Sequence, residues 1–361
     1  MRVLHAADFH LDSAFAGGNA DRARQLRREA RELPGRLADY VNQNRIDLVL
    51  LAGDLFDSGE IYRDTLDALT EALGKMDARV FIAPGNHDFY SSASPYAAAR
   101  WPENVHIFRS AAIERVVLPE LSCAVYGAAF TGAAQETSLL SGFAAPEDGL
   151  AHLMVLHADV DAAEPRYDPV TRAEIAASGL DYLALGHRHA CTGIQAAGHT
   201  AYAYSGCIAG RGFDETGEKG FLAGTVERGR AAMAFVPFAR RRYETLRVDV
   251  TDADPADALE RALPEDTARD LYRITFTGET DERGIDGKAL HERFAPAFFA
   301  LELRDETRIR QDVWARASED SLRGLFLREL RERYDAAAER ERPMIERAAR
   351  FGLAALDKRE L

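Results

Sequence analysis

Short runs of apolar residues recur through the first 240 residues, and most of them are followed by glycine or by polar residues. Several runs are apolar at nearly every position, which is typical of strands that are covered on both faces. Helical periodicity separates the early runs, whereas the later runs follow one another more closely. This order predicts an α/β domain layered around two sheets. The predicted strands cover residues 2–7, 46–53, 79–85, 123–130, 153–158, 181–187, 200–206, 221–227 and 231–238.

Two helical regions are predicted between the first three strands. The first has apolar residues three to four positions apart and contains the pair Pro34-Gly35. Because proline lacks the N–H that helical hydrogen bonding requires, we expect this pair to split the region into two helices. The second helix is expected at about 60–76, with Leu66, Leu69 and Leu73 on one side.

The pattern of apolar residues changes after the sequence ARRRY at 239–243. Residues 244–305 have the periodicities of strand, helix, strand, helix and strand in turn, as expected of a small α+β unit. From about residue 306 the chain is highly charged, and its apolar residues return at helical spacing. We therefore expect three parts: a domain at 1–240, a small unit at 241–305 and a helical segment at 306–361.

The composition is that of an ordered protein without a membrane segment. Of the 361 residues, 47% are hydrophobic, which is enough for a sizeable core. No apolar run approaches the roughly 18–20 residues that span a bilayer, and the N-terminus has no signal-peptide pattern. The three cysteines have no CxxC spacing, so neither a disulfide framework nor a zinc knuckle is expected. We expect a cytoplasmic protein that does not interact with membranes.

The formal net charge of −14 argues against a surface built for nucleic acid in general. Arginines nevertheless cluster at 22–31 and in the ARRRY sequence. A solvated helix face and a linker are the favoured interpretations of these clusters. A nucleic-acid substrate would then have to be bound by a local groove, by a dimer or with the help of a partner protein.

Residues that can bind metals or move protons occur at the ends of five predicted strands. In α/β sheets, ligands bind at the carboxyl ends of the strands. Residues two apart in an extended chain face the same side, so Asp8 with His10 and His187 with His189 each form a pair. Taken singly, each residue could instead be a turn residue, a helix cap or a core histidine. The residues are Asp8 and His10, Asp54, Asn86 with His87 and Asp88, His157, and His187 with His189.

Seven ligands remain when His87 and Asp88 are set aside: two aspartates, one asparagine and four histidines. This is too many for one transition metal, and it suits two metals that share a bridging carboxylate. Mixed nitrogen and oxygen ligands favour Mn, Fe or Zn over Ca or Mg. Two divalent ions, two aspartates and a hydroxide leave a charge of about +1, which matches a single phosphodiester anion.

The ordered set D-x-H, GD-x-x-D, GNHD, H and GH-x-H resembles the calcineurin-like metallophosphoesterase superfamily over roughly residues 1–240. The resemblance implies a four-layer α/β/β/α sandwich with a dinuclear metal site. It also implies that His87, oriented by Asp88, stabilises the transition state or protonates the leaving oxygen. The implied ligands are Asp8, His10, Asp54 and His189 for one metal, and Asp54, Asn86, His157 and His187 for the other.

Two features narrow the resemblance to DNA repair nucleases. The sequences GDLFDSG and GNHDFY differ from the GD-x-x-DRG and GNHE of protein serine/threonine phosphatases. The segment YSGCIAGRGFDETGEKGF at 204–221 is similar to a stretch of SbcD-type and Mre-type exonucleases. This resemblance implies a DNA exo/endonuclease that prefers Mn²⁺, acts from 3′ ends and attacks with a hydroxide that bridges two metals.

The same resemblance assigns roles to the rest of the chain. Residues 241–305 would form a capping domain that shapes DNA, and the C-terminal helices would dock on the coiled coil of an SMC-like ATPase of the SbcC type. Those helices could instead pack on the chain's own core. Two other functions stay open: a small-molecule phosphodiesterase or phosphatase with the same site, and a non-catalytic scaffold that recruits partners. A homodimer is a further open alternative.

Overall fold

The computed structural model describes residues 1–13, 20–59, 61–281, 284–310 and 313–356. Contacts between residues group the chain into two compact units. The predicted boundaries near residues 240 and 305 stay predictions. The first unit comprises Met1–Leu246, Pro264–Ile274 and His291–Glu302, and the second comprises Arg247–Leu263, Thr275–Leu290 and Leu303–Leu361.

The first unit contains a six-stranded sheet made of β1 (Arg2–Ala6), β2 (Leu48–Leu51), β3 (Arg79–Ile82), β4 (Val105–Ile107), β11 (Gly220–Glu227) and β12 (Arg230–Pro237). The strand order is β12-β11-β1-β2-β3-β4. Strands β1 to β4 are parallel to one another, and β11 is antiparallel to both β1 and β12. Every residue of β2 is buried, as its unbroken apolar run predicts.

A second sheet in the same unit consists of β5 (Glu114–Leu118), β6 (Cys123–Gly127), β7 (Ala151–His157), β8 (Tyr182–Gly186), β9 (Gln195–Ala197) and β10 (Thr200–Tyr204). Its order is β5-β6-β7-β8-β10-β9, with antiparallel strands only at the two edges. The sequence did not predict β4, β5 or β9. These strands are only three to five residues long and are partly exposed, so they leave no continuous apolar run.

The helices of the first unit are α1 (Ala20–Gln43), α2 (Arg63–Gly74), α3 (Pro95–Ala98) and α4 (Arg172–Ala177). Helix α1 corrects the prediction of two helices, because it is a single helix with Pro34 inside it. An interior proline costs a helix about 3 kcal/mol. Leu33, Pro34 and Leu37 lie on the buried face of α1, and the burial of these apolar side chains offsets the cost of the proline.

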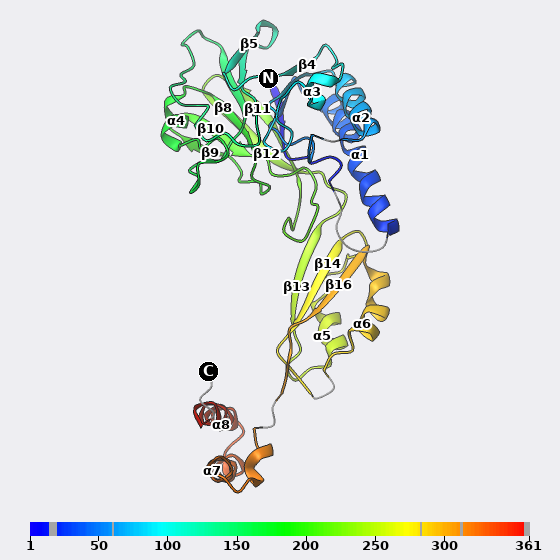
Figure 1. Cartoon of the computed structure of the whole chain (residues 1–361), viewed down its shortest axis with the longest axis vertical. Helices are drawn as coiled ribbons and strands as arrows, with labels where there is room; N and C mark the ends of the chain where they lie inside the picture. The colour runs from blue at the N-terminus through cyan, green and yellow to red at the C-terminus, as the bar shows by residue number, and fades with distance from the viewer. Residues whose placement is uncertain (14–19, 60, 282–283, 311–312, 357–361) are drawn as a thin grey trace. The chain divides into compact units, whose positions relative to one another are not determined.

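The two sheets pack face to face, and helices cover the outer face of each sheet (Figure 1). Leu50 of β2 and Val155 of β7 belong to the cluster buried between the sheets. The neighbouring residue of β2, Val49, points the other way and packs in the cluster beneath α1 and α2. Met154 of β7 packs in the cluster beneath α4 together with Ile175. These α/β/β/α layers confirm the predicted fold class.

A small α+β region follows the sandwich, in the predicted order of strand, helix, strand, helix and strand. Strands β13, β14 and β16 form its sheet, and the boundary between the two units passes through all three. Its elements are β13 (Tyr243–Asp249), α5 (Pro255–Ala262), β14 (Leu271–Thr277), α6 (Gly287–Phe294) and β16 (Ala300–Asp305).

The C-terminal segment is helical, but its helices begin later than residue 306. A short strand, β17 (Arg308–Ile309), first pairs with β15 (Glu279–Thr280), and a 3-10 turn follows at Ala315–Ser318. Helices α7 (Leu322–Ala336) and α8 (Arg342–Leu356) then share a small buried cluster that includes Leu327 and Ala349. None of the helices in the described ranges is both long enough and apolar enough to cross a membrane.

His5 of β1 is a fully buried link between the two sheets. The hydroxyl of Tyr182 donates to its Nδ1 at 2.8 Å, and its Nε2 donates to the carbonyl of Leu185 at 3.1 Å. Burial lowers the pKa of His5 to about 3. This histidine therefore has a structural role and lies outside the predicted ligand set.

The buried His5 predicts a stability that depends on pH. The unfolded histidine titrates near 6.5, so below about pH 6.5 the unfolded chain binds a proton that the folded chain excludes, and stability is lost on acidification. We expect His5 to lower the free energy of unfolding by about 1.4 kcal/mol per pH unit between about pH 6 and pH 4. Urea unfolding of the metal-free protein measures this slope. The variant His5→Gln should show a slope smaller by that amount, and an unchanged slope would contradict the prediction.

Candidate metal centre

The loops that follow β1 and β2 run side by side and fix the first predicted ligands. The backbone N–H of Asp8 donates to the carbonyl of Gly53 at 3.0 Å, and that of His10 donates to the carbonyl of Asp54 at 2.9 Å. The pairing continues from Leu11 to Leu55 at 2.9 Å. Because the two loops are joined in this register, Asp8 and His10 lie beside Asp54.

Four of the predicted ligands have backbone conformations that side chains disfavour. The φ angles are 53° at Asp8, 43° at His10, 50° at Asp54 and 102° at His187. Such conformations cost on the order of 1–3 kcal/mol each and persist only where the surrounding structure enforces them. Their concentration here supports a functional role for these four residues. The positive φ of His187 also explains why this residue and His189, two positions apart, face different neighbours.

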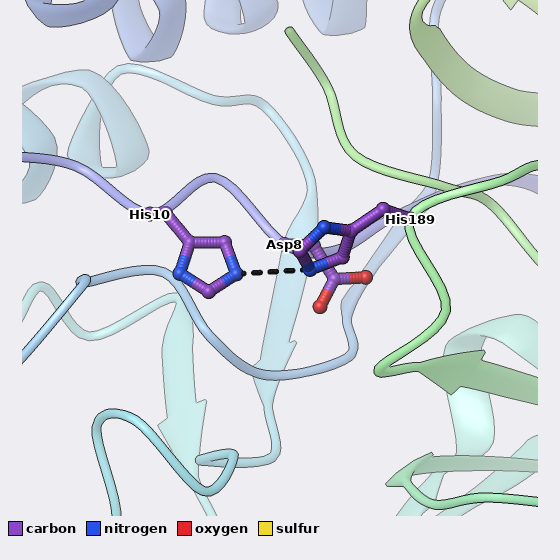
Figure 2. A group of neighbouring side chains, drawn as sticks. All are labelled: Asp8, His10 and His189. Atoms are coloured by element: carbon purple, nitrogen blue, oxygen red, sulfur yellow. Dashed lines mark hydrogen bonds between the residues drawn. The ribbon is translucent and has the colours of Figure 1, made fainter. Parts of the chain in front are cut away.

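One cluster of ligand atoms comes from Asp8, His10 and His189, all within 4.8 Å of one another (Figure 2). The Nε2 atoms of His10 and His189 face each other at 3.2 Å. On the other side of each ring, Nδ1 donates to a carboxylate, from His10 to Asp57 at 3.1 Å and from His189 to Glu215 at 2.7 Å. The protons are therefore on Nδ1, and two Nε2 lone pairs point at one another.

These facing lone pairs fit a shared cation. Two lone pairs at this separation repel each other, and burial lowers the pKa of His10, so protonation of that ring does not relieve the repulsion. Two nitrogens about 2.1 Å from one tetrahedral metal lie roughly 3.4 Å apart, close to the separation found here. The carboxylate of Asp8 completes the cluster with an oxygen ligand.

A second cluster is formed by Asp8, Asp54 and His157. The Nδ1 of His157 donates to the carbonyl of Ala52 at 3.0 Å, so its Nε2 is again an acceptor. That Nε2 lies 2.9 Å from Oδ1 of Asn86 and 3.4 Å from Oδ2 of Asp54, two further acceptors. Three converging acceptors without a donor also suit a cation.

His187 completes the predicted set. Its ring centroid lies 5.2 Å from that of His157, and its backbone N–H donates to the carboxylate of Asp8 at 3.1 Å. Asp54 is shared, because its Oδ2 lies 3.7 Å from Nε2 of His10 as well as near His157. The structure therefore brings all seven predicted ligands together, with Asp54 between the two groups. Their assignment to two metals stays a prediction.

Burial sets the charge state of these ligands before any cation binds. It lowers the pKa of His157 and of His187 to about 4, so both rings are neutral near pH 7 and keep a lone pair. Burial, and then the nearby carboxylate of Asp54, raises the pKa of Asp8 well above its usual range. A divalent cation would stabilise the charged form of Asp8 and compensate the buried carboxylates. The donor set thus fits two divalent cations.

The structure corrects the expected support of His87. The carboxylate of Asp88 accepts hydrogen bonds from the backbone N–H groups of Leu55, Phe56 and Gly85 and from the hydroxyl of Tyr96, and none from the ring of His87. The Nδ1 of His87 donates instead to the carbonyl of Asp57 at 3.0 Å. Asp88 is buried and fixes the loop, because its acceptors are used by neighbouring backbone groups. His87 itself is exposed, and its ring centroid lies 4.9 Å from that of His10.

Arg211 and Glu215 are part of the site, and the sequence did not identify them. Glu215 is buried and accepts from His189, and Arg211 donates to Glu215 at 2.7 Å and to Asp57 at 3.1 Å. One guanidinium therefore holds the two carboxylates that orient His10 and His189. Both residues lie in the segment 204–221, but a contact with strand ends far away in the sequence leaves no spacing that could reveal it.

Replacing Glu215 by glutamine is expected to weaken metal binding. Glutamine presents a neutral acceptor or a donor to Nδ1 of His189, so the tautomer that directs Nε2 toward the cation is less stable. We expect the affinity for Mn²⁺ to fall about 10- to 100-fold, as measured by calorimetric titration. The exposed Glu218, three residues along the same loop, supplies the matched control Glu218→Gln. Equal affinities for both variants would contradict the role of Glu215.

Comparisons of the sequence and the structure with known proteins found three matches. A profile of the family described as calcineurin-like phosphoesterase matches residues 1–191. The chain is 30% identical over 284 residues to the uncharacterized metallophosphoesterase YhaO of Bacillus subtilis (strain 168), a match that covers 76% of this chain and 69% of that protein. It is also similar to the crystal structure of a dimetal phosphatase from Danio rerio, with 14% identity, a TM-score of 0.39, and coverage of 62% of this chain and 91% of the other.

The family profile covers the whole of the predicted metal centre. It begins before Asp8 and ends two residues after His189, so it includes every strand end that carries a predicted ligand. The relative from Bacillus subtilis extends the similarity beyond this region. By its sequence, the chain belongs to the calcineurin-like phosphoesterases, enzymes that hydrolyse phosphate esters with divalent metals.

Proposed function

We propose that this metallophosphoesterase is a nuclease that cleaves phosphodiester bonds of DNA. One observation carries the proposal: the segment 204–221, which is similar to a stretch of repair exonucleases, is built into the site. Its Glu215 binds His189 at 2.7 Å, and its Arg211 reaches Asp57 at 3.1 Å. A segment that resembles a stretch of repair exonucleases thus orients the residues that would hold the metals.

The chain's own residues divide the work of hydrolysis. Two divalent cations in this site would acidify a water molecule and neutralise charge on the phosphate oxygens, and Mn²⁺ suits the mixed nitrogen and oxygen ligands. Asp54 keeps the two ligand groups in register, and His10 and His189 are held in one tautomer by carboxylates. As the P–O bond to the leaving group breaks, His87 in its protonated form would donate the Nε2 proton to the departing oxygen.

The C-terminal helices present apolar side chains that suit the binding of a partner protein. Leu322, Leu325, Met344 and Phe351 are 51–75% exposed on α7 and α8. Exposed apolar side chains on neighbouring helices suit docking on the apolar surface of another helix. We propose an SMC-like ATPase as that partner. Co-purification of the two proteins after co-expression tests it, and Leu325→Asp should abolish the complex while leaving hydrolysis of naked DNA unchanged.

The net charge of −14 favours a second candidate, a phosphodiesterase of small molecules. An acidic surface repels a long polyanion, whereas a single phosphate experiences chiefly the local field of the cations. Turnover of end-labelled duplex DNA, of cyclic nucleotides and of a chromogenic phosphodiester, each with Mn²⁺, separates the two. Release of nucleotides from the 3′ end of DNA supports the nuclease. Hydrolysis of the small esters with intact DNA would replace it by the second candidate.

A further inference from the structure

A cavity of about 770 Å³ lies in the first compact unit and adjoins the predicted metal centre. Its volume is within the range of about 300–1,000 Å³ typical of sites for small ligands. No predicted metal ligand lines it, so it is distinct from the metal centre. The lining residues that matter for its chemistry are Arg22, Arg211, Phe213, Tyr243, Arg273 and Glu302.

Arg211 connects the cavity to the metal centre. It lines the cavity, and its Nη1 donates to the carboxylate of Asp57 at 3.1 Å. Its Nη2 lies 3.4 Å from Nδ1 of His189. Arg211 therefore both lines the cavity and lies beside a predicted metal ligand. The group esterified to a phosphate at the metals would lie in this region.

Flat groups line the cavity. The half-buried ring of Phe213 meets the ring of Tyr243 edge to face, with 5.2 Å between centroids. The guanidinium of Arg273 lies over Phe213 at 4.1 Å and binds Glu302 at 3.0 Å. Aromatic rings and a planar guanidinium stack well on a heteroaromatic base. The Arg273–Glu302 pair adds hydrogen-bond donors and an acceptor, which the edge of a base can use.

The charge of the cavity differs from that of the rest of the chain. Arg22, Arg211 and Arg273 outnumber Asp214 and Glu302 in its lining. In the second unit, a cavity of about 480 Å³ has four carboxylates and one arginine in its lining, which would repel a phosphate ester.

Arg22 is the cation that is available to a ligand. Arg240, Arg241 and Arg242 all form ion pairs with carboxylates. Arg22 forms none with any residue in the described ranges. A cation at the cavity that is not already neutralised suits an anionic ligand.

We propose that this cavity binds the nucleoside esterified to the scissile phosphate, with the base against Phe213 and Tyr243 and with Arg22 near a flanking phosphate or sugar. The proposal rests on the proposed function, because it places the phosphate of that same reaction at the metals. It adds recognition of a nucleoside, which hydrolysis of a phosphodiester does not itself require. A nucleotide monoester and the end of a DNA strand share this chemistry.

Two chromogenic esters with the same leaving group test the proposal by activity. They are the p-nitrophenyl ester of thymidine 5′-monophosphate and methyl p-nitrophenyl phosphate, which lacks a nucleoside. We expect the wild type with Mn²⁺ to prefer the nucleoside ester at least about tenfold in kcat/KM, since stacking of one base contributes on this scale. Phe213→Ala and Arg22→Gln should each reduce that ratio about five- to tenfold. Equal kcat/KM values for the two esters in the wild type would overturn the nucleoside site and leave the phosphodiesterase standing.

A binding measurement keeps the proposal testable even where turnover fails. Calorimetry with the metal-free protein compares thymidine 5′-monophosphate with deoxyribose 5-phosphate. We expect the nucleotide to bind at least about tenfold more tightly, and Phe213→Ala to remove most of that difference. Tyr62→Ala, at an aromatic residue that is 63% exposed and does not line the cavity, is the matched control. Equal affinities for the two ligands overturn the proposal, and base-dependent binding without hydrolysis would overturn the proposed function alone.

Oligonucleotides distinguish the two sources of the nucleoside. One carries an ordinary 3′-terminal nucleotide, and the other carries an abasic residue there. Slower release of the abasic residue by wild type, and no such difference for Phe213→Ala, would assign the cavity to the end of a DNA strand. Equal release of both residues, together with base-dependent binding of the monophosphate, would assign it to mononucleotide esters. Unfolding curves of each variant confirm that the compared proteins are folded.

Discussion

Replacing Asp54 by asparagine is expected to abolish hydrolysis and, in the metal-free protein, to raise stability. Asp54 is 2% exposed, and its Oδ2 lies 3.7 Å from Nε2 of His10 and 3.4 Å from Nε2 of His157, so it is the predicted ligand between the two groups. Asparagine keeps an oxygen that can accept from the backbone N–H of His87, a hydrogen bond that Asp54 makes at 3.0 Å. It removes the charge that would bind the two cations. A loss of several kcal/mol of transition-state stabilisation lowers the rate of hydrolysis by about 10³-fold or more.

The gain in stability follows from the buried carboxylates. The charge of Asp54 is one reason why the pKa of Asp8 is raised, after burial itself. Without cations, two such groups in one buried site destabilise the fold, and a neutral amide relieves the repulsion. We expect the free energy of unfolding in chelator to rise by about 1 kcal/mol or more. Metal analysis and urea unfolding measure both effects, with the exposed Asp64→Asn of α2 as a control. Two tightly bound metals and a normal rate in Asp54→Asn would contradict the shared role.

Replacing His87 by alanine is expected to preserve metal binding and to slow hydrolysis of DNA about 10²- to 10⁴-fold. The side chain is exposed, and its hydrogen bond goes to the backbone of Asp57. The contact of this residue with Asp54 is made by its backbone N–H, which alanine retains. The variant therefore removes the proton donor and leaves the ligand groups in place.

A change of leaving group separates proton donation from metal binding for His87. A p-nitrophenolate ion departs without being protonated, so a chromogenic ester should lose far less activity in His87→Ala than DNA does. His87, His10 and Asp54 also form a cluster of ligand-capable atoms within 4.8 Å. If His87 bound a metal, the variant would contain less metal and lose activity equally on both substrates. Metal content measured beside the two rates decides between these roles.

Most of the fold was predictable because its strands are buried on both faces. An unbroken apolar run such as that of β2 is too short for a buried helix, so its length favours a strand. The short edge strands escaped prediction, since in β5 three of the five residues are exposed and only Leu118 is buried. The continuous α1 escaped too, because the packing that offsets the cost of Pro34 comes from parts of the chain distant in sequence.

The seven predicted ligands could be identified because each one lies at or just after the end of a predicted strand, and strand ends converge. The residues that orient those ligands obey no such rule. Glu215 meets His189 across a loop, and Asp88 is directed toward backbone N–H groups rather than toward His87. Contacts of this kind depend on the path of loops in three dimensions. Local sequence patterns do not encode that path.

The left-handed backbone at Asp8, His10, Asp54 and His187 has a consequence for engineering. Glycine adopts those angles without steric strain, so substituting it there would relieve the strained backbone while deleting a ligand. A screen that selects only for survival at high temperature would therefore enrich inactive proteins altered at these positions. Thermostable forms that still turn over substrate will have to draw their improvements from elsewhere in the sandwich.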